Sequence, residues 1–382
     1  MSNHLKLHSF TGNTDHDFTG LVSGQPIIFN GTNIVSTGDT TTGGNLWSAS
    51  TGANSIIANN GSGNLASGFY AVSMGAGSQA TSDYSFAAGW NNISSGNGSA
   101  TFGGVINVLG SVSEPNTASG FSSFAIGGNC VASGDTSFAG GRNSVAYHSS
   151  IAFGSFSRAL GAVSASFGNG TLASGVNSFA IGIDNTASSY NSFVGGNQSL
   201  VSGNTAFCFG LVNISGGFIS TSLGGTYNNA LGDYSAVIGG KYNTASSAHS
   251  SVIGGQYNTA SLSHSFVIGG QYNTASNIDS AVVAGSGNTV SGTRSAVIGG
   301  QFNNATGSNS AILGGSGNIV SGAHSVIIGG QNITGTTDNT VYVPNLEITT
   351  NAYNALIMTS PDGTRWNISV TNGGAFTLSA IL

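Results

Sequence analysis

The feature that most limits how this chain can fold is a short repeat that keeps one length throughout its C-terminal half. The run from Ser235 to His249 is followed, in the same register, by runs that start at Ser250 and Ser265. Glycine recurs at one place in every repeat, at Gly240, Gly255, Gly270, Gly285, Gly300, Gly315 and Gly330. A strict period this short predicts a solenoid, because one repeat cannot bury its own apolar face and has to stack on its neighbours.

The repeat divides the chain into three parts. Residues 51–335 hold about nineteen repeats of 14 or 15 residues, which at ~4.8 Å per coil would form a shaft roughly 90 Å long. The stretch 105–118 interrupts the repeats and is interpreted as a loop. Residues 1–50 and 336–382 lack the repeat and read as short strands around turn signals such as Asn-Gly and Pro-Asp-Gly. We expect a small β segment at each end, with the final strand buried.

Composition excludes several classes of protein. Charged residues make up 5% of the chain, glycine numbers 62 and proline only 4, so the chain is neither an ordinary globular enzyme nor a collagen. No apolar run approaches the ~18 residues of a membrane span. Six Lys and Arg residues, with a net charge of −6, leave no basic surface for phosphates. We therefore expect no membrane insertion and no nucleic-acid partner.

The N-terminus and the cysteines bear on where the protein is made. The stretch from Met1 to Asp17 contains three His and two Asp instead of the apolar core of a secretory signal, which predicts a chain that is not marked for export. Cys130 and Cys208 lie about six coils apart, roughly 25–30 Å along the shaft, which is too far for a disulfide. Both are expected to be free, packed thiols.

Two adjacent aliphatic columns run through the repeats. They are Val237, Val252, Val267, Val282, Val297, Ile312 and Ile327, and Ile238, Ile253, Ile268, Val283, Ile298, Leu313 and Ile328. Neighbouring residues of a strand point to opposite faces, so both faces of this strand are expected to be buried. One column would fill the coil, and the other would need a second surface. The simplest cover is another copy in a parallel homo-oligomer, and the sequence leaves open which column is inside.

Other columns have structural interpretations. The glycine pair after each strand lets the chain turn within a thin coil. The asparagine column, which includes Asn243, Asn258 and Asn273, is expected to form a stacked amide ladder or to occupy a left-handed turn conformation. Small residues such as Ala245 and Ala260 would supply a short opposite strand and keep the coil flat.

Two further columns are weaker candidates for surface binding. Tyr242, Tyr257 and Tyr272 form an aromatic column, which is more typical of packing between subunits than of sugar binding. His249 and His264 belong to a polar column that could hold a ligand or an ion, or could simply face solvent. The repeats lack a third group for a Ser-His triad, and they lack the motifs of calcium-binding rolls and phosphate loops. We expect no catalytic, metal or cofactor-binding site.

The repeats ASGFSSFAIGGNCVASG at 118–134 and ASGVNSFAIGIDNTASS at 173–189 resemble the head repeats of trimeric autotransporter adhesins. In that family such repeats build a left-handed parallel β-roll, with three copies side by side. The resemblance covers roughly residues 55–335. It implies a parallel homotrimer with an extracellular, surface-binding role.

The ends resemble a different class of protein. The segments at 16–39 and 340–381 are similar to the ends of bacteriophage fibre proteins, which implies that residues 1–50 dock on a virion protein and that 336–382 form a trimer cap. A phage product is assembled in the host cytoplasm, which agrees with the missing export signal.

We therefore predict an all-β, left-handed parallel β-roll or solenoid that forms a homotrimeric tail or head fibre of a phage virion. It would contribute to attachment to a glycan or protein of the host surface. The alternative is a bacterial trimeric surface adhesin. A surface-glycan depolymerase is less favoured, because the acidic residues are scattered, and Glu114 and Asp135 would be its test positions. The host receptor and the choice between head and tail stay open.

Overall fold

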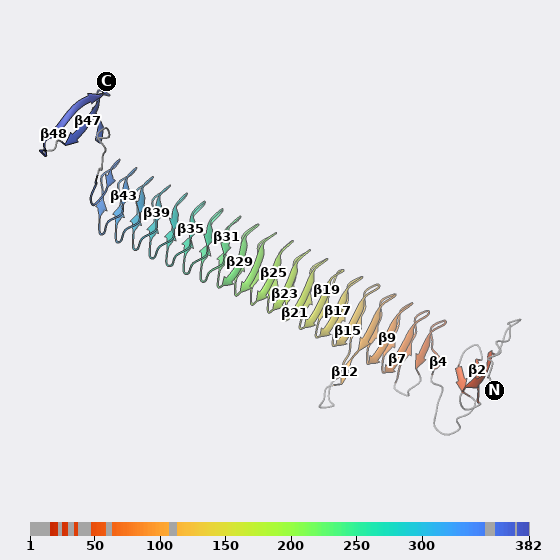
Figure 1. The fold of residues 1–382 in the computed structure, drawn as a ribbon. Helices are drawn as coiled ribbons and strands as arrows, with labels where there is room; N and C mark the ends of the chain where they lie inside the picture. Colours follow the sequence, from red (N-terminus) through yellow and green to blue (C-terminus); the bar gives the residue numbers. More distant parts are fainter. Residues whose placement is uncertain are drawn as a thin grey trace.

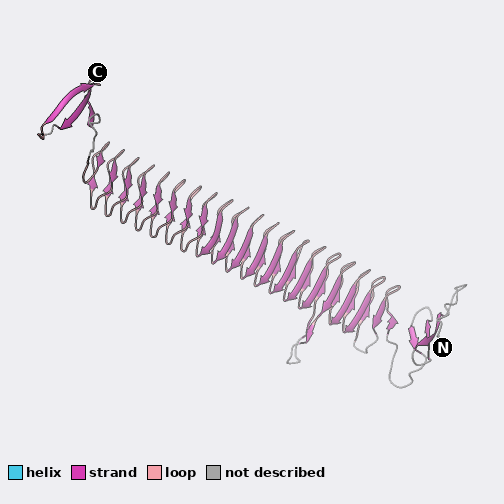
Figure 2. Cartoon of the chain, in the orientation of Figure 1, coloured by secondary structure: helices cyan, strands magenta, loops and turns pink. Residues whose placement is uncertain are grey.

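The structure is a computed structural model that describes residues 16–21, 25–29, 34–36, 47–58, 63–106, 113–347, 356–370 and 373–381. All regular secondary structure within these residues is β-strand, and the coils stack side by side into a long rod (Figures 1 and 2). Each coil contains a longer strand, a turn, a two-residue strand and a second turn. The prediction of an all-β parallel solenoid is confirmed.

The longer strands form one parallel ladder along the rod, because each pairs with the equivalent strand of the next coil. The ladder contains β5 (Ile56–Ala58), β7 (Val72–Ala76), β9 (Phe86–Trp90), β11 (Ala100–Gly103), β15 (Phe124–Gly128), β17 (Phe138–Arg142), β19 (Ile151–Ser155), β21 (Ala165–Asn169), β23 (Phe179–Ile183), β25 (Phe193–Asn197), β27 (Phe207–Leu211), β29 (Thr221–Thr226), β31 (Ala236–Ile238), β33 (Ser251–Ile253), β35 (Phe266–Ile268), β37 (Ala281–Val283), β39 (Ala296–Ile298), β41 (Ala311–Leu313), β43 (Val326–Ile328) and β45 (Val341–Tyr342). We call the outward side of this ladder the long-strand face.

The short strands form a second parallel ladder, whose outward side we call the short-strand face. It contains β6 (Leu65–Ala66), β8 (Gln79–Ala80), β10 (Ile93–Ser94), β14 (Thr117–Ala118), β16 (Val131–Ala132), β18 (Val145–Ala146), β20 (Arg158–Ala159), β22 (Leu172–Ala173), β24 (Thr186–Ala187), β26 (Leu200–Val201), β28 (Ile214–Ser215), β30 (Asn229–Ala230), β32 (Thr244–Ala245), β34 (Thr259–Ala260), β36 (Thr274–Ala275), β38 (Thr289–Val290), β40 (Asn304–Ala305), β42 (Ile319–Val320) and β44 (Thr334–Gly335). These nineteen strands of the described residues agree with the number of coils expected from the repeats.

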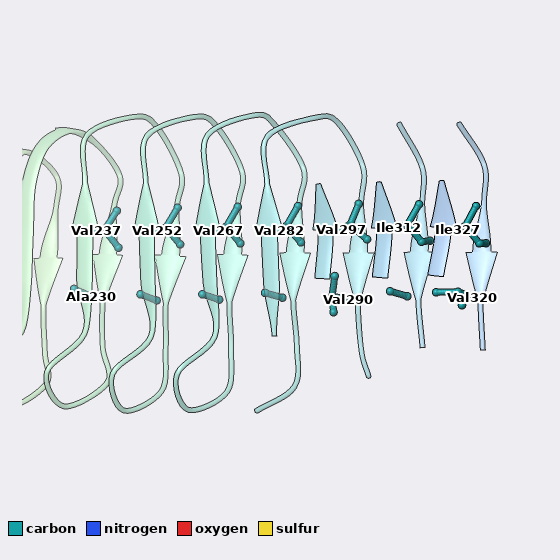
Figure 3. Close-up of a cluster of buried hydrophobic side chains, with 14 residues drawn as sticks. Ala230, Val237, Val252, Val267, Val282, Val290, Val297, Ile312, Val320 and Ile327 are labelled. Carbon is teal, nitrogen blue, oxygen red and sulfur yellow. The ribbon is translucent and has the colours of Figure 1, made fainter. Parts of the chain in front are cut away.

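The valine column fills the interior of the coil. Val237, Val252 and Val267 are 0% exposed, and they pack against Ala245 and its equivalents on the short strands (Figure 3). Alanine fits there because the two ladders lie close together, as predicted. The neighbouring isoleucine column points outward, with Ile253 45% exposed in the single chain. The structure thus decides which of the two aliphatic columns is inside.

Two corners of each coil have left-handed backbone, and side chains other than glycine occupy them. Tyr242 has a φ of 57° and His249 a φ of 56°, and the equivalent residues of the other coils repeat these values. Left-handed backbone costs an ordinary residue roughly 1–2 kcal/mol. The cross-coil hydrogen bonds, such as that from the Tyr257 amide to the Lys241 carbonyl, hold each corner in place. The asparagine column beside the tyrosines takes no part in this left-handed turn.

The coil becomes longer part-way along the rod by gaining a glycine. Across β27 and β29, Phe209 pairs with Leu223 while Leu211 pairs with Thr226, so the longer coil has one extra residue between these two pairs. From β31 to β43, the longer of the two strands in each coil contains three residues instead of five. A pair of residues with positive φ follows it, which is Gly-Gly in every one of these coils except that of Ala284 and Gly285. The added residue turns the end of the strand into a sharper corner.

The N-terminal segments and the interruption of the repeats both form antiparallel pairs. β1 (His16–Leu21), β2 (Gln25–Phe29) and β3 (Ile34–Ser36) make a small sheet, while the expected Asn30-Gly31 turn lies outside the described residues. β4 (Trp47–Ala49) pairs antiparallel with β5 at the first coil. The expected loop at 105–118 contains a pair of strands, β12 (Val105–Ile106) and β13 (Ser113–Glu114), before β14 resumes the short-strand ladder. Figure 1 shows β12 projecting from the side of the rod.

The rod ends on its own residues. Ile333 and Tyr342 pack against the last buried side chains, and the Tyr342 hydroxyl accepts a 2.8 Å hydrogen bond from the Thr337 amide. Beyond the rod, β46 (Leu356–Thr359), β47 (Arg365–Val370) and β48 (Phe376–Ile381) form a three-stranded antiparallel sheet. The predicted Pro-Asp-Gly turn lies between its first two strands. The prediction that the final strand is buried was wrong for the single chain, because Phe376 is 78% exposed.

Candidate functional site: the exposed stripes of the rod

An apolar stripe runs along the long-strand face. It consists of side chains that are between 38% and 51% exposed: Ile126, Phe153, Ile181, Phe209, Leu223, Ile238, Ile253, Ile268, Ile298, Leu313 and Ile328. The strand alternation that turns the valines inward forces these side chains outward. Soluble monomers rarely expose a continuous apolar surface of this extent, and such surfaces mark interaction sites. The sequence predicted that this column needs a cover, and in the single chain it has none.

In the N-terminal half, phenylalanines widen the apolar stripe. Phe179, Phe193 and Phe207 stack two positions before the stripe column, with ring centroids 5.0 and 4.8 Å apart. Gly195 belongs to the stripe column itself, and the ring of Phe209 from the next coil lies over it. The sequence analysis missed this phenylalanine column, although its regular recurrence once per repeat is visible in the sequence.

The tyrosine column forms a continuous stack on one edge of the rod. Ring centroids of Tyr227, Tyr242, Tyr257 and Tyr272 are 4.8 to 4.9 Å apart, and the Lys241 Nζ lies 5.0 Å from the centroid of the Tyr242 ring. The two inner rings, Tyr242 and Tyr257, each stack on a neighbouring ring with both faces and leave only their edges for other contacts. The stack therefore packs against itself within one chain, so it needs no second subunit to explain it.

The polar column lies on the opposite edge of the coil. The rings of His249 and His264 are stacked at 5.1 Å, and Tyr234 stacks on His249 at 5.0 Å. Asp279 follows, with one carboxylate oxygen 3.6 Å from the Nδ1 of His264 and the other 3.7 Å from the Nε of Arg294. These exposed ion pairs are worth at most about 1 kcal/mol. Among the described residues there is no group of three or more His, Cys, Asp or Glu side chains placed to hold a metal ion.

The asparagine column is a buried hydrogen-bond ladder. The Asn258 Nδ2 donates to the carbonyls of Gly254 and Gly270, at 3.3 and 3.1 Å, and its Oδ1 accepts the amide of Asn273 at 3.0 Å. Each side chain thereby joins its own coil to the coil that follows. The ladder therefore runs from side chain to backbone, and not from amide to amide as in a stacked amide ladder. Gly240, Gly255 and Gly270 have positive φ, and a Cβ on any of them would overlap the backbone of the next coil.

The remaining positions raised by the sequence also have structural roles. The Oδ1 of Asp135 accepts the Phe121 amide at 2.9 Å, and Asp233 makes the same contact with Phe218. Glu114 lies in β13, on the segment that projects from the rod. Cys130 and Cys208 are free and buried, as predicted, and burial raises the pKa of the Cys208 thiol to about 12. No helix among the described residues is long and apolar enough to cross a membrane.

Comparison with known protein families finds a match in three stretches of the rod. The sequence model of the YadA head domain repeat (2 copies) matches residues 66–92, 118–144 and 173–204, which all lie in the parallel ladders. These coils are similar to YadA heads. The matched stretches share an inward alanine or valine, an outward Ile or Phe, and a glycine near the end of the longer strand. No curated protein matches the chain.

The YadA-like coils support the description of the protein as an adhesin-like repeat shaft. All three matched stretches lie in the N-terminal half of the rod, before the point at which the coils gain their extra glycine. The longer coils that follow keep the same two ladders and the same inward column. The two ladders and the inward column of the matched coils therefore continue to the end of the rod.

Proposed function

We propose that the protein is a homotrimeric, adhesin-like fibre that attaches to a cell surface, with three rods lying parallel and their apolar stripes facing one another. The single observation that supports this proposal is the apolar stripe, which repeats an exposed aliphatic or aromatic side chain at almost every coil. Burial of apolar area is worth about 25 cal/mol per Å², so the gain adds up along the whole rod. The short-strand face offers less, since in the C-terminal half it presents threonines such as Thr259.

The geometry also supports the role of a fibre. A rod of about nineteen coils with few charges and two ladders along its length holds its two ends far apart, which suits a spacer between an anchor and a target (Figure 1). The non-repetitive parts, at the two ends and in the β12–β13 projection, are then the places for specific contacts. The similarity to YadA heads supports a binding role over an enzymatic one.

We further propose that the fibre belongs to a phage virion and docks there through residues 1–50, while its far end meets a glycan or protein of the host. This setting rests on the resemblance of the end segments to phage fibre proteins. The YadA-like coils favour a bacterial surface adhesin at least as well. Immunogold electron microscopy with an antibody against the rod separates the two settings. Label on purified phage particles supports the virion fibre, and label on the surface of uninfected bacteria overturns it in favour of the adhesin.

Trimer formation is tested by light scattering, which should give three times 37.8 kDa for the purified chain. The double variant Ile253→Asp/Ile268→Asp places charges in the apolar stripe and should shift the mass to that of a monomer, while circular dichroism still shows β structure. The matched control is Thr259→Asp/Thr274→Asp, which puts two charges at the same spacing on the short-strand face and should stay trimeric. A monomeric parent chain, or a control that dissociates while the stripe variant does not, would refute the proposed interface.

A further inference from the structure

The C-terminal sheet has one apolar side and one polar side. Residues directly opposite each other in its strands share a side, and the pairings place seven apolar side chains together: Leu356, Met358, Trp366, Ile368, Phe376, Leu378 and Ala380. The other side carries mainly polar residues, among them Thr359, Arg365, Asn367, Thr377 and Ser379. A sheet with one hydrophobic face buries that face against another element in a stable arrangement.

Within the described residues, side chains on this apolar side stay exposed. Phe376 is 78% exposed, Leu378 66% and Met358 55%. A hollow of about 450 Å³ opens among Met358, Pro361, Trp366, Ile368 and Leu378. The end of the rod does not need the sheet, because Ile333 and Tyr342 already close its interior. The apolar side of the sheet is therefore available for another molecule.

The apolar stripe by itself does not fix how neighbouring rods align along their length. In the C-terminal half the apolar stripe is almost the same at every coil, since Ile238, Ile253 and Ile268 are 44%, 45% and 40% exposed. Two such stripes that slip by one coil, ~4.8 Å, still face like side chains. The N-terminal half varies more, but its Gly140–Phe153 arrangement recurs four coils later as Gly195–Phe209. A uniform stripe thus holds rods together without setting their register.

We propose that the apolar sides of three C-terminal sheets pack against one another and set the register of the trimer. This inference rests on the proposed parallel trimer, because parallel rods bring three copies of the sheet to the same end. There the sheets meet at a high effective concentration, which favours another copy of this chain over an outside partner. The sheet occurs once per chain, so the aligned arrangement is the one in which all three sheets meet with equivalent connections to their rods. In this proposal the non-repetitive end sets the register of the three rods, and the repeats supply the apolar surface that holds the rods together.

Disulfide trapping in the full chain tests the register. The parent for the test carries Ile238→Cys and Ile268→Cys, which lie two coils apart, about 9.6 Å, and so cannot bond within one chain. In aligned trimers, oxidation joins like positions, 238 with 238 and 268 with 268. In trimers slipped by two coils it joins 238 with 268. In trimers slipped by one coil neither pair of cysteines meets, so the yield of cross-linked chains falls. Mass spectrometry of the cross-linked peptides distinguishes the two products, and the native cysteines are buried.

The decisive variant adds Phe376→Asp and Leu378→Asp, which charge the apolar side of the sheet. We expect a trimer by light scattering in which the share of mixed 238–268 peptides rises about tenfold or more, a change equivalent to about 1.4 kcal/mol of register preference. The matched control adds Thr377→Asp and Ser379→Asp on the polar side of the same strand. This control should keep the pattern of the parent, with like positions joined.

Each outcome separates the two proposals. A trimeric variant that still joins only like positions overturns the role of the sheet and leaves the proposed trimer intact. A variant that becomes monomeric also overturns it, because the sheet would then drive assembly instead of aligning it. A parent chain that is monomeric refutes the trimer itself. Equal slippage in the control and in the variant would show that added charge, and not the apolar side, moves the register.

Discussion

From Ala230 to Ile327 the interior of the rod is one unbroken cluster of buried Val, Ala and Ile, whereas between Ala66 and Cys208 it is divided into three clusters. Layers of buried hydroxyl groups separate the clusters. In one layer the hydroxyls of Ser157, Ser166 and Thr171 bond to one another at 2.9 to 3.3 Å. Both halves nevertheless keep the same two ladders.

This comparison shows which parts of a coil are exchangeable. Interior side chains are exchangeable when their hydrogen bonds close within the coil or with its neighbours, because a buried polar group is costly only when it lacks a partner. The glycine at the end of the longer strand cannot be exchanged in this way. In both halves, at Gly168 and at Gly255, a Cβ would overlap the backbone of the next coil. The backbone contacts between coils therefore tolerate fewer substitutions than the side chains of the interior do.

The largest expected difference in stability is between alanine substitutions at two adjacent glycines of the C-terminal half. Gly255→Ala should destabilise the rod by more than about 4 kcal/mol or prevent folding, because its Cβ would overlap the Gly270 carbonyl. Gly254→Ala should cost only about 1–2 kcal/mol, as expected for an ordinary residue at positive φ. Nothing lies within 4 Å of a Cβ on Gly254, and Ala284 occupies the same place with a φ of 59°. Urea denaturation followed by circular dichroism measures both, and similar midpoints would contradict the steric explanation.

The asparagine ladder should make the next largest difference between the halves. Asn258→Ala removes three hydrogen bonds and leaves buried backbone groups unpaired, so we expect a loss of about 3 kcal/mol. Ser144 stands in the same column of the N-terminal half, and its hydroxyl donates to the Gly154 carbonyl at 2.9 Å. Ser144→Ala should therefore cost only about 1 kcal/mol. Equal losses in thermal unfolding would mean that the ladder adds nothing beyond single hydrogen bonds.

A pH effect is expected from the N-terminal half. Burial raises the pKa of Cys208 from 9.0 to about 12, so in the folded state the thiol keeps its proton after the unfolded thiol has lost it. Stability from this group is complete below pH 9 and falls as the pH rises from about 9 to 12, by about 1.4 kcal/mol per pH unit. Cys208→Val, which copies Val194 of the preceding coil, should remove this part of the pH dependence. A variant with an unchanged slope above pH 9 would contradict the assignment.

The smallest net effect should come from converting a polar layer into an apolar one. Ser166→Ala alone leaves two buried hydroxyls short of a partner and should cost about 1–2 kcal/mol. The triple variant Ser157→Ala/Ser166→Ala/Thr171→Val removes the whole network and should end within about 1 kcal/mol of the parent. Chemical denaturation of single and triple variants measures this non-additivity. Losses that simply add up would show that the three hydroxyls do not act as one network.

Much of the fold could be predicted because the repeat exposes each role as a column. The glycine column predicted the turns, the asparagine column the ladder, and the aliphatic pair a strand with two apolar faces. The signal for the left-handed corners at Tyr242 and His249 lies in other coils, where Gly287, Gly317 and Asn309 occupy the same two columns. Tyrosine rarely adopts such backbone, so the tyrosine coils by themselves did not indicate it. The side chains of Tyr242 and His249 appeared instead as candidate binding groups. Their stacking within one chain follows from the corner geometry, which only the assembled coils create.

The sequence by itself determined that the chain is a parallel solenoid of about nineteen coils, because a short, strict period has few other ways to bury its apolar residues. Only the tertiary structure decided that Val252 points inward and Ile253 outward, since adjacent positions of a strand are equivalent until the direction of the next turn is known. The structure also showed that the terminal strand with Phe376 is exposed. That strand belongs to a sheet whose apolar side is exposed in the part of the chain that the structure describes. Pairing between strands, not periodicity, decides which residues share that side.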